Sequence, residues 1–408
     1  MRYYKNIELS KRFGIGGNTI SRWIENANEG KNSLLIKETK QLTNDKIVYR
    51  IISNGHNENE LIRLFQNGRS RNQLKNTKPI DLYTKDLKIF TTKEITNLIT
   101  ALEEKHIPFK LSYKNNGATL WDEFIKEGKR TGDYTTTKRT EELLKLFIHH
   151  LEIINPNNKK INFFDIGCGN FMPVEKFVRY LNDKKMLNKY IAIDISKEML
   201  EIAKSNAEKI LTSDQVKCFV GDFEKENFSE YSNLYRDEDT INVITILGST
   251  IGNSNDQRVI LTNLRDSLIK DDILLVSNKM DSQIEKSKFN HILDKNDQLL
   301  WIPTLLGIDT GEIQFNYYYD SNKDARIIAM KLDKDYDLTF HFENSTAKRK
   351  LYLNASDQII LWHHKMSKLE EIPNQFVRAG LDMIAHYTSE EDKIGLFICR
   401  KRAYSDRI

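Results

Sequence analysis

Residues 163–181 read FFDIGCGNFMPVEKFVRYL, an apolar run followed by an acidic residue, two glycines separated by one position, and an amphipathic segment. This order predicts a buried strand, a tight turn and a helix. Gly167 and Gly169 lack a Cβ atom, so the backbone of the turn can approach a ligand closely. The stretch therefore indicates a small-molecule site at the carboxyl end of a strand.

Four more apolar segments follow, with room for a helix between one strand and the next. The five candidate strands are 161–167, 189–195, 216–223, 240–248 and 272–278. Strands that alternate with helical patterns are typical of an α/β fold with helices on both faces of the sheet. We predict a Rossmann-like sheet with a nucleoside-binding core at about 140–280 and substrate regions at about 100–140 and 281–408.

Acidic residues at the ends of the second and third strands indicate the ligand. Asp194, followed by Ile195, ends the second strand, where a carboxylate can accept hydrogen bonds from two ribose hydroxyls. The third strand ends in Gly-Asp-Phe, so Asp222 is placed to accept from the exocyclic amine of adenine and Phe223 to flank the ring. These positions predict a nucleoside site.

The glycine turn differs from turns that bind phosphates. It lacks the third glycine of a dinucleotide fingerprint, and residues 170–173 contain no lysine. S-adenosylmethionine fits such a turn, because its sulfonium and amino-acid tail need acidic and carbonyl partners. The expected cofactor residues are Asp165, Gly167, Gly169, Asp194, Ile195, Asp222, Phe223 and Gly248.

The segment after the fourth strand narrows the class further. Residues 246–253 read ILGSTIGN, without the Asn/Asp-Pro-Pro-aromatic motif of amino-type DNA methyltransferases and without a Pro-Cys nucleophile. It resembles the histidine-specific methyltransferases, which trimethylate the α-amine of L-histidine. The segments YKNNGATLWDEF (113–124), GDYTTTKRTEELL (132–144) and VRAGLDMIAHYTSEEDKIGLFICRKR (377–402) carry the same resemblance, which extends over about 108–402.

The resemblance implies a class I methyltransferase domain at 81–408 and assigns roles to single residues. Tyr113 and Asn253 take the positions that hold the amino and carboxylate groups of the substrate, which makes them the expected catalytic residues. Tyr134 is the expected second tyrosine of the substrate site. Methyl transfer to a neutral amine needs orientation and a dry pocket rather than a strong general base.

One departure from the family concerns its specificity pair. Where the family presents Glu-x-Ser to the imidazole, this chain reads QIILWHHKMSK (358–368), and Trp362 and His364 become candidate substrate residues. A site without the carboxylate is expected to discriminate poorly for histidine and to face another aromatic or a larger substrate. The alternative is that His363 and His364 belong to a strand, with one side chain inward and one outward.

The first 80 residues form a separate basic segment. They carry 15 Lys and Arg against 7 Asp and Glu, a balance of +8 in a chain whose net charge is +4. Leu9 and Phe13 on one predicted helix, a glycine turn, and Ile20 and Trp23 on a second helix resemble a small helix-turn-helix module. We predict a helical, helix-turn-helix-like domain at 1–80 that binds DNA, or alternatively a helical cap with a solvated basic face.

Composition sets further limits. Cys168, Cys218 and Cys399 are scattered and lack CxxC spacing, so neither a disulfide framework nor a metal site is expected. No apolar run approaches the roughly 20 residues that span a bilayer. A cytoplasmic protein without membrane partners is the prediction.

Three functions stay open at this point. The first is N-methylation of an amino acid, a peptide or a related metabolite. The second is a DNA-binding regulator whose methyltransferase-like domain senses a metabolite. The third is a protein or RNA methyltransferase that residues 1–80 recruit to its target.

Overall fold

The computed structural model describes residues 3–4, 35–40, 46–51, 78–132, 135–280, 297–343, 346–389 and 394–403, in two units, Met1–Lys78 and Pro79–Ile408. In the first unit, β1 (Tyr3–Tyr4), β2 (Leu35–Lys40) and β3 (Lys46–Ile51) form an antiparallel sheet of order β1-β3-β2. The two helices predicted within residues 7–31 lie outside the described residues, so the helix-turn-helix module stays a prediction.

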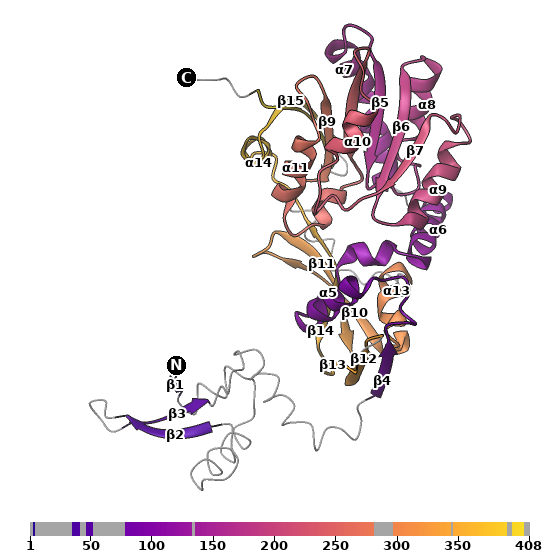
Figure 1. The fold of residues 1–408 in the computed structure, drawn as a ribbon. Coiled ribbons are helices and arrows are strands. Elements are labelled where there is room, and N and C mark those ends of the chain that lie inside the picture. The colour runs from indigo at the N-terminus through magenta and orange to yellow at the C-terminus, as the bar shows by residue number, and fades with distance from the viewer. Residues whose placement is uncertain are drawn as a thin grey trace. The chain divides into compact units, whose positions relative to one another are not determined.

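A seven-stranded sheet forms the core of the second unit. Its strands are β5 (Lys160–Ile166), β6 (Leu187–Asp194), β7 (Val216–Val220), β8 (Thr240–Ile246), β9 (Ile273–Lys279), β15 (Leu381–Thr388) and β16 (Ile394–Lys401). The order is β15-β16-β9-β8-β5-β6-β7 (Figure 1). The five strands predicted from the sequence are present and parallel, which confirms the Rossmann-like α/β fold. Because the strand order reverses at β5, ligands are expected at the carboxyl ends of β5 and β8.

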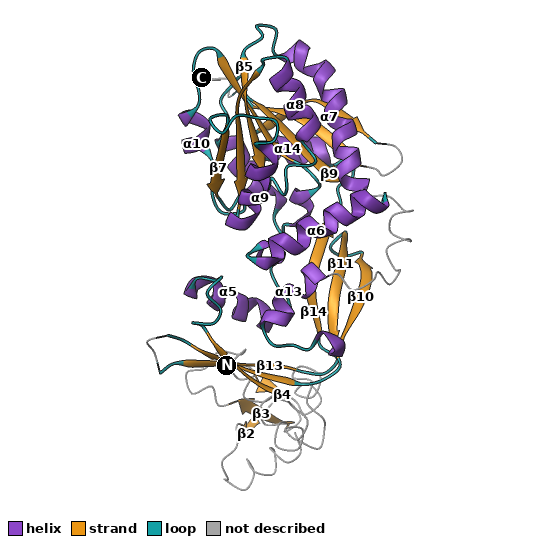
Figure 2. Ribbon diagram, turned by 90° about the vertical axis from the view of Figure 1, so that its right-hand side faces the viewer, coloured by secondary structure: helices purple, strands orange, loops and turns teal. Residues whose placement is uncertain are grey.

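Helices cover both faces of this sheet, as Figure 2 shows from the side. The helices are α7 (Thr135–Ile154), α8 (Glu175–Asp183), α9 (Lys197–Ala207), α10 (Ser229–Leu234), α11 (Gln257–Asp266) and α14 (Ile372–Arg378). Successive side chains of β5 enter different cores, since Phe163 packs with α7 and α8 while Phe164 packs with α11 and α14. Two buried faces explain why the parallel strands read as continuous apolar runs.

The last two strands complete the sheet rather than the substrate region. Within the predicted substrate region 281–408, β16 pairs antiparallel with β9, and β15 pairs antiparallel with β16. Side chains of these strands pack with α7 on one face and with α14 on the other, so the strands extend the core sheet beyond β9. The core sheet therefore combines two separate ranges of this unit, 160–279 and 381–401.

A second lobe, formed by residues 78–113 and 297–365, has its own core. It contains β4 (Lys78–Tyr83), α5 (Thr92–Glu103), the 3₁₀ helices η1 (Phe109–Tyr113) and η3 (Thr310–Glu312), α13 (Asp297–Leu305), β10 (Ile313–Asp320), β11 (Ala325–Leu332), β12 (Tyr336–His341), β13 (Lys348–Leu353) and β14 (Gln358–Lys365). The strands form two sheets, β10-β11-β14 and β13-β12-β4, over one apolar cluster. Two elements, α6 (Asn116–Thr131) and η2 (Thr250–Asn253), lie where the lobe meets the core sheet.

A buried ion pair lies at the amino ends of β8 and β9, opposite to the strand ends that line the ligand crevice. Arg236 donates two hydrogen bonds of 2.8 and 2.7 Å to Asp272, which is 1% exposed. The same carboxylate accepts the backbone N–H groups of Asn242 and Ile269. Asp272 therefore joins β8 to the loops before β8 and β9.

Asp272→Ala is expected to lower the free energy of unfolding by about 3 kcal/mol, because it leaves the Arg236 guanidinium without its buried partner. Asp266→Ala is the matched control, since Asp266 pairs with Arg265 at the surface and should change stability by less than about 1 kcal/mol. Urea denaturation of both variants measures the difference. Equal losses in the two variants would contradict this account.

Candidate functional site

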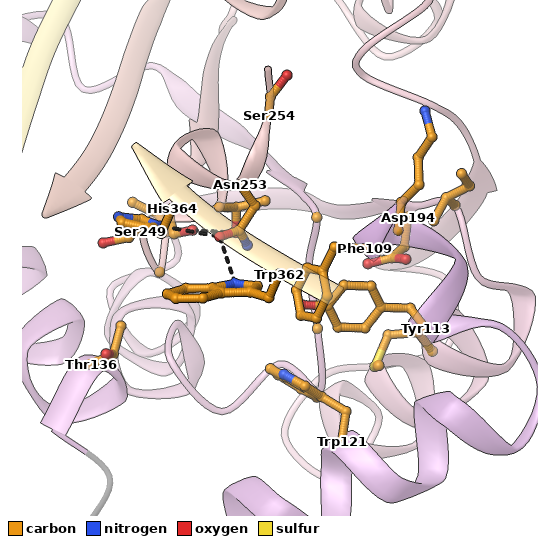
Figure 3. A pocket seen from close by; sticks show the side chains of 18 of the residues that line it. Phe109, Tyr113, Trp121, Thr136, Asp194, Ser249, Asn253, Ser254, Trp362 and His364 are labelled. Atoms are coloured by element: carbon orange, nitrogen blue, oxygen red, sulfur yellow. Dashed lines mark hydrogen bonds between the residues drawn. The ribbon is translucent and has the colours of Figure 1, made fainter. Parts of the chain in front are cut away.

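A cavity of about 460 Å³ lies at the carboxyl ends of the core strands, closed on the other side by α6, η1 and β14. Acidic and glycine residues of the core line one part of it, and aromatic and histidine residues of the second lobe line another. In Figure 3, Asp194 and Tyr113 lie on one side, and Asn253 and His364 on the other.

The two glycines of the turn are needed for different reasons. Both have left-handed φ angles, +65° at Gly167 and +53° at Gly169. A Cβ atom on Gly169 would lie 2.7 Å from the indole ring of Trp121, so this space belongs to a protein side chain. A Cβ atom on Gly167 would meet Thr250 at 3.2 Å. The turn is thus packed between α6 and η2, and its backbone lines the cavity.

Two carboxylates stand side by side at the ends of β5 and β6. Asp165 accepts a 3.0 Å hydrogen bond from the hydroxyl of Tyr190, and Asp194 accepts one of 3.0 Å from the backbone N–H of Ser196. Burial raises the pKa of Asp165 to about 7, and the charge of Asp194 adds to this. Burial likewise raises the pKa of Asp194 to about 6. Ionisation of either group in the empty cavity is therefore costly.

Asp222 lines the cavity but already has cationic partners. Its Oδ2 lies 3.0 Å from the ammonium groups of both Lys110 and Lys225, while Oδ1 accepts the N–H of Glu224. Burial acts to raise the pKa of Asp222, but the two lysines bring it below its ordinary value. An adenine amine would share this carboxylate with Lys110, a partner that the sequence did not reveal. Phe223 lies next to it on the same wall.

Tyr113 ends η1 beside the acidic part of the cavity. Its ring meets Trp121 edge-on at 6.1 Å between centroids (Figure 3). Burial raises the pKa of the phenol, and the charge of Asp194 adds to this, while a hydrogen bond with Gln298 acts the other way. The hydroxyl therefore stays protonated at neutral pH and serves as a hydrogen-bonding group rather than as a base.

Asn253 joins the specificity positions into one cluster. Its Oδ1 lies 3.1 Å from Nε1 of Trp362 and 3.1 Å from Nδ1 of His364. The two rings stack with centroids 5.6 Å apart. A Cβ atom on Gly252 would fall 2.1 Å from the His364 ring, so the glycine of the ILGSTIGN segment makes room for this imidazole.

A β-bulge sets the faces of β14. Ile360 pairs with Ala329 and Trp362 pairs with Ile328, so Leu361 is the extra residue. Trp362 and His364 consequently stand on the face opposite to Ile360, which strict alternation would have put on their side. His363 pairs with Ile327 and His364 with Arg326 in the unbroken part of the ladder, so both histidines belong to β14 and stand on opposite faces of it, as the alternative predicted, while both residues border the cavity.

A third histidine lies across from His363. His106, held beside β14 by backbone hydrogen bonds of its neighbours to Ile360, has its ring centroid 5.9 Å from that of His363. Burial lowers the pKa of His106 to about 4, and it lowers the pKa of His363 as well. Nothing in the sequence around His106 pointed to this position.

Of the residues predicted for the site, all but one line this single cavity. They are Tyr113, Asp165, Gly167, Gly169, Asp194, Ile195, Asp222, Phe223, Gly248, Asn253, Trp362 and His364. Tyr134 lies outside the described residues. The described part of the chain has no group of three His, Cys, Asp or Glu side chains placed to hold a metal ion, and no helix there is long and apolar enough to cross a membrane.

The sheet order, the glycine turn and the strand-end acids define a class I methyltransferase. The chain belongs to the family of histidine-specific, S-adenosylmethionine-dependent methyltransferases, whose pattern matches residues 91–401. Its methyl donor is therefore S-adenosylmethionine. This match begins at residue 91, whereas the resemblance seen in the sequence begins at about residue 108, so the family pattern also includes α5.

Several solved structures are similar in fold. A methyltransferase from Clostridium acetobutylicum is 11% identical, with 68% of this chain and 99% of that chain covered and a TM-score of 0.41. The magnesium protoporphyrin IX methyltransferase of Synechocystis is 10% identical, with 72% and 98% covered and a TM-score of 0.37. No curated protein matches the chain.

The raised pKa of Asp194 predicts how stability depends on pH. In the unfolded chain this carboxyl titrates near 3.8, and in the fold near 6. Between these values the folded state holds a proton that the unfolded state has lost. The contribution of Asp194 to stability therefore falls as pH rises from about 4 to about 6 and stays low above that.

Asp194→Asn is expected to make the ligand-free protein more stable than the unsubstituted protein at about pH 8, with a difference that shrinks toward about pH 4. The same variant should bind S-adenosylmethionine at least about tenfold more weakly, or about 1.4 kcal/mol. Thermal melts across this pH range and isothermal titration check the two effects. Lower stability at pH 8, or unchanged affinity, would be the contrary result.

Proposed function

We propose that this protein transfers a methyl group from S-adenosylmethionine to the amino group of an amino acid, a peptide or a related metabolite. The observation that carries the proposal is the arrangement of one cavity, which has an acidic, glycine-lined part at β5 and β6 and hydrogen-bonding residues Tyr113 and Asn253 beyond it. Family membership supplies the methyl donor.

The residues present fit S-adenosylmethionine. In this proposal the buried carboxylate of Asp194 accepts from the ribose, and Asp222 and Phe223 hold the adenine. The backbone of the Gly167–Gly169 turn and the adjacent Asp165 meet the cationic, amino-acid end of the molecule. When bound, S-adenosylmethionine supplies an electrophilic methyl group on a sulfonium. Its positive charge would favour the ionised form of the two buried carboxyls, whose pKa values are raised by burial.

Orientation is the main task of the substrate residues. Tyr113 lies beside Asp194, so its hydroxyl can hold an amine close to the donor side of the cavity. Asn253 lies across the cavity, where it can hold a carboxylate or carbonyl of the same substrate (Figure 3). Aromatic residues Phe109, Trp121 and Trp362 line the cavity and would limit the access of water to the reacting groups. These contacts position a neutral amine for in-line attack, and no residue has to act as a strong base.

Histidine fits this cavity poorly. The specificity positions hold Trp362 and His364, which bind each other through Asn253 and offer no carboxylate to an imidazole N–H. A hydrogen bond to a neutral acceptor is weaker than one to a carboxylate, so a site without that charge is expected to discriminate less for an imidazole N–H. The methyl acceptor in this proposal is therefore a different amine, and the family description does not by itself give the substrate.

Full-length protein incubated with methyl-labelled S-adenosylmethionine and a metabolite extract is expected to yield a labelled amine by mass spectrometry. Free L-histidine should react at least about tenfold less efficiently than this acceptor. Tyr113→Phe should reduce transfer about tenfold or more, whereas Tyr180→Phe on α8, outside the cavity, should leave it unchanged. Efficient trimethylation of L-histidine, or label on oxygen or carbon alone, would refute the proposal.

The charge of the first unit supports a second proposal, that residues 1–80 bind nucleic acid. Its balance of +8 would favour contacts with phosphates. Such a module would recruit the enzyme to DNA or RNA, or make the methyltransferase domain a sensor in a DNA-binding regulator.

Gel shifts of full-length protein on duplex DNA are expected to weaken steeply with salt, with a log–log slope near −0.9 for each phosphate contact. Deleting residues 1–77, which leaves β4 intact, should abolish the shift and leave S-adenosylmethionine binding unchanged. Absence of any shift at low salt would show that the module does not bind duplex DNA.

A further inference from the structure

Lys110 joins η1 of the second lobe to the loop that follows β7 in the core. Its ammonium lies 3.0 Å from Oδ2 of Asp222 and 2.5 Å from Oε2 of Glu224. The two pairs connect residues that are 112 and 114 positions apart in the chain. η1 is therefore held against the part of the cavity where the adenine of S-adenosylmethionine is expected.

Both ion pairs are partly buried. Lys110, Asp222 and Glu224 all line the cavity, and the side chains of Lys110 and Asp222 are 26% and 14% exposed. Burial acts to lower the pKa of Lys110, but its bonds to the two carboxylates raise it above its ordinary value, so the ammonium stays charged. A purine bound beside Asp222 would displace water from these pairs, and opposite charges attract more strongly where water is excluded.

The geometry of η1 links the position of Lys110 to that of Tyr113. A 3₁₀ helix has about three residues per turn, so residues at i and i+3 lie on the same side of it. Both side chains line the cavity, and Tyr113 lies beside Asp194 (Figure 3). Backbone hydrogen bonds donated by Leu111 and Lys114 close the turns around them. A shift of Lys110 would therefore move Tyr113 as well.

Other contacts hold η1 without reaching the adenine side of the cavity. Just before η1, the N–H of Ile107 donates to the backbone of β14 over 2.8 Å. Just after it, Lys114 pairs with Glu94 on α5 at 2.5 Å, and the N–H of Asn115 donates to Glu198 on α9 over 3.2 Å. The ion pairs at the loop after β7 thus connect η1 to the expected adenine position, and these contacts do not.

We propose that Lys110 is a positioning residue that couples the donor end of the cavity to the acceptor end. Adenine bound at Asp222 strengthens the ion pairs of Lys110, and η1 then holds Tyr113 in place for the acceptor amine. The acceptor site is complete only when the donor is bound. This inference rests on the proposed function, because it takes Tyr113 to orient the amine.

Hydrogen exchange of full-length protein, with and without S-adenosylhomocysteine, tests the coupling in peptides that cover residues 107–116. Each variant is saturated according to its own measured affinity, so weaker binding does not affect the comparison. The ligand should slow exchange in η1 about tenfold or more in the unsubstituted protein. In Lys110→Met it should slow exchange about threefold or less, and Lys110→Arg, which keeps the charge, should restore part of the effect.

Lys225→Met is the matched control. Lys225 also lies 3.0 Å from Oδ2 of Asp222, but it stands three positions after Asp222 in the same loop, and its side chain is 61% exposed. Its loss removes an equivalent charge without removing the link to η1, so the slowing of exchange should persist. The proposal is overturned if the unsubstituted protein shows no slowing, if Lys110→Met keeps it, or if Lys225→Met loses it equally.

Turnover separates positioning from donor affinity. With the acceptor found by mass spectrometry, Lys110→Met should lower kcat about tenfold or more and change KM for S-adenosylmethionine about threefold or less. A raised KM with unchanged kcat would overturn the inference, because Lys110 would then serve donor binding alone. Exchange coupling without any methyl transfer would count against the proposed function alone. Methyl transfer with coupling that survives in Lys110→Met would count against this inference alone.

Discussion

The carboxylates of Asp165 and Asp194 are buried at the carboxyl ends of β5 and β6, where ionisation of either group costs free energy. Tyr190 and Thr245 donate hydrogen bonds to Asp165, and backbone N–H groups donate to Asp194, but burial still raises the pKa of both carboxyls. A cationic ligand would relieve this cost. Ligand binding and the stability of the empty protein therefore oppose each other at these residues, as is common in binding sites.

The second lobe and α6 supply the wall of the cavity that faces the core strands. Trp121 on α6 packs on the glycine turn, and Lys110 on η1 reaches the carboxylates of Asp222 and Glu224. Both side chains come from residues that precede the core sheet in the chain. The core sheet and the elements that face it across the cavity are thus joined by packing and by ion pairs.

The sequence predicted the parts of the fold that depend on local pattern. The five parallel strands are long apolar runs, and Asp194 follows one of them directly, so strand ends and acids could be placed together. Gly169 was recognised for its missing Cβ atom, but the space was assigned to a ligand, whereas it admits Trp121. That contact joins residues 48 positions apart, and no local pattern contains it.

The contacts among the histidines and Asn253 could likewise not be predicted from local sequence patterns. His106 comes within contact of His363 only through the pairing of residues 105–107 with Ile360, and Asn253 meets Trp362 across 109 positions. The faces of β14 also depend on a bulge, which strict alternation cannot foresee. Motif resemblance nevertheless named Asn253, Trp362 and His364, because it carries information on long-range contacts that composition and periodicity lack.

Because β14 contains one extra residue at its bulge, a different side chain could take the place of Trp362 with little change in the rest of the strand. Moving the bulge by one position would pair Leu361 with Ile328 and leave Trp362 as the extra residue, while His363 and His364 kept their partners. Both ends of the strand would stay in register, so the neighbouring core would need no repacking. An indole donor would thereby be replaced by an aliphatic side chain, and Asn253 would regain a free lone pair. Substitutions that merely shift the bulge would thus change which side chain β14 presents to the cavity.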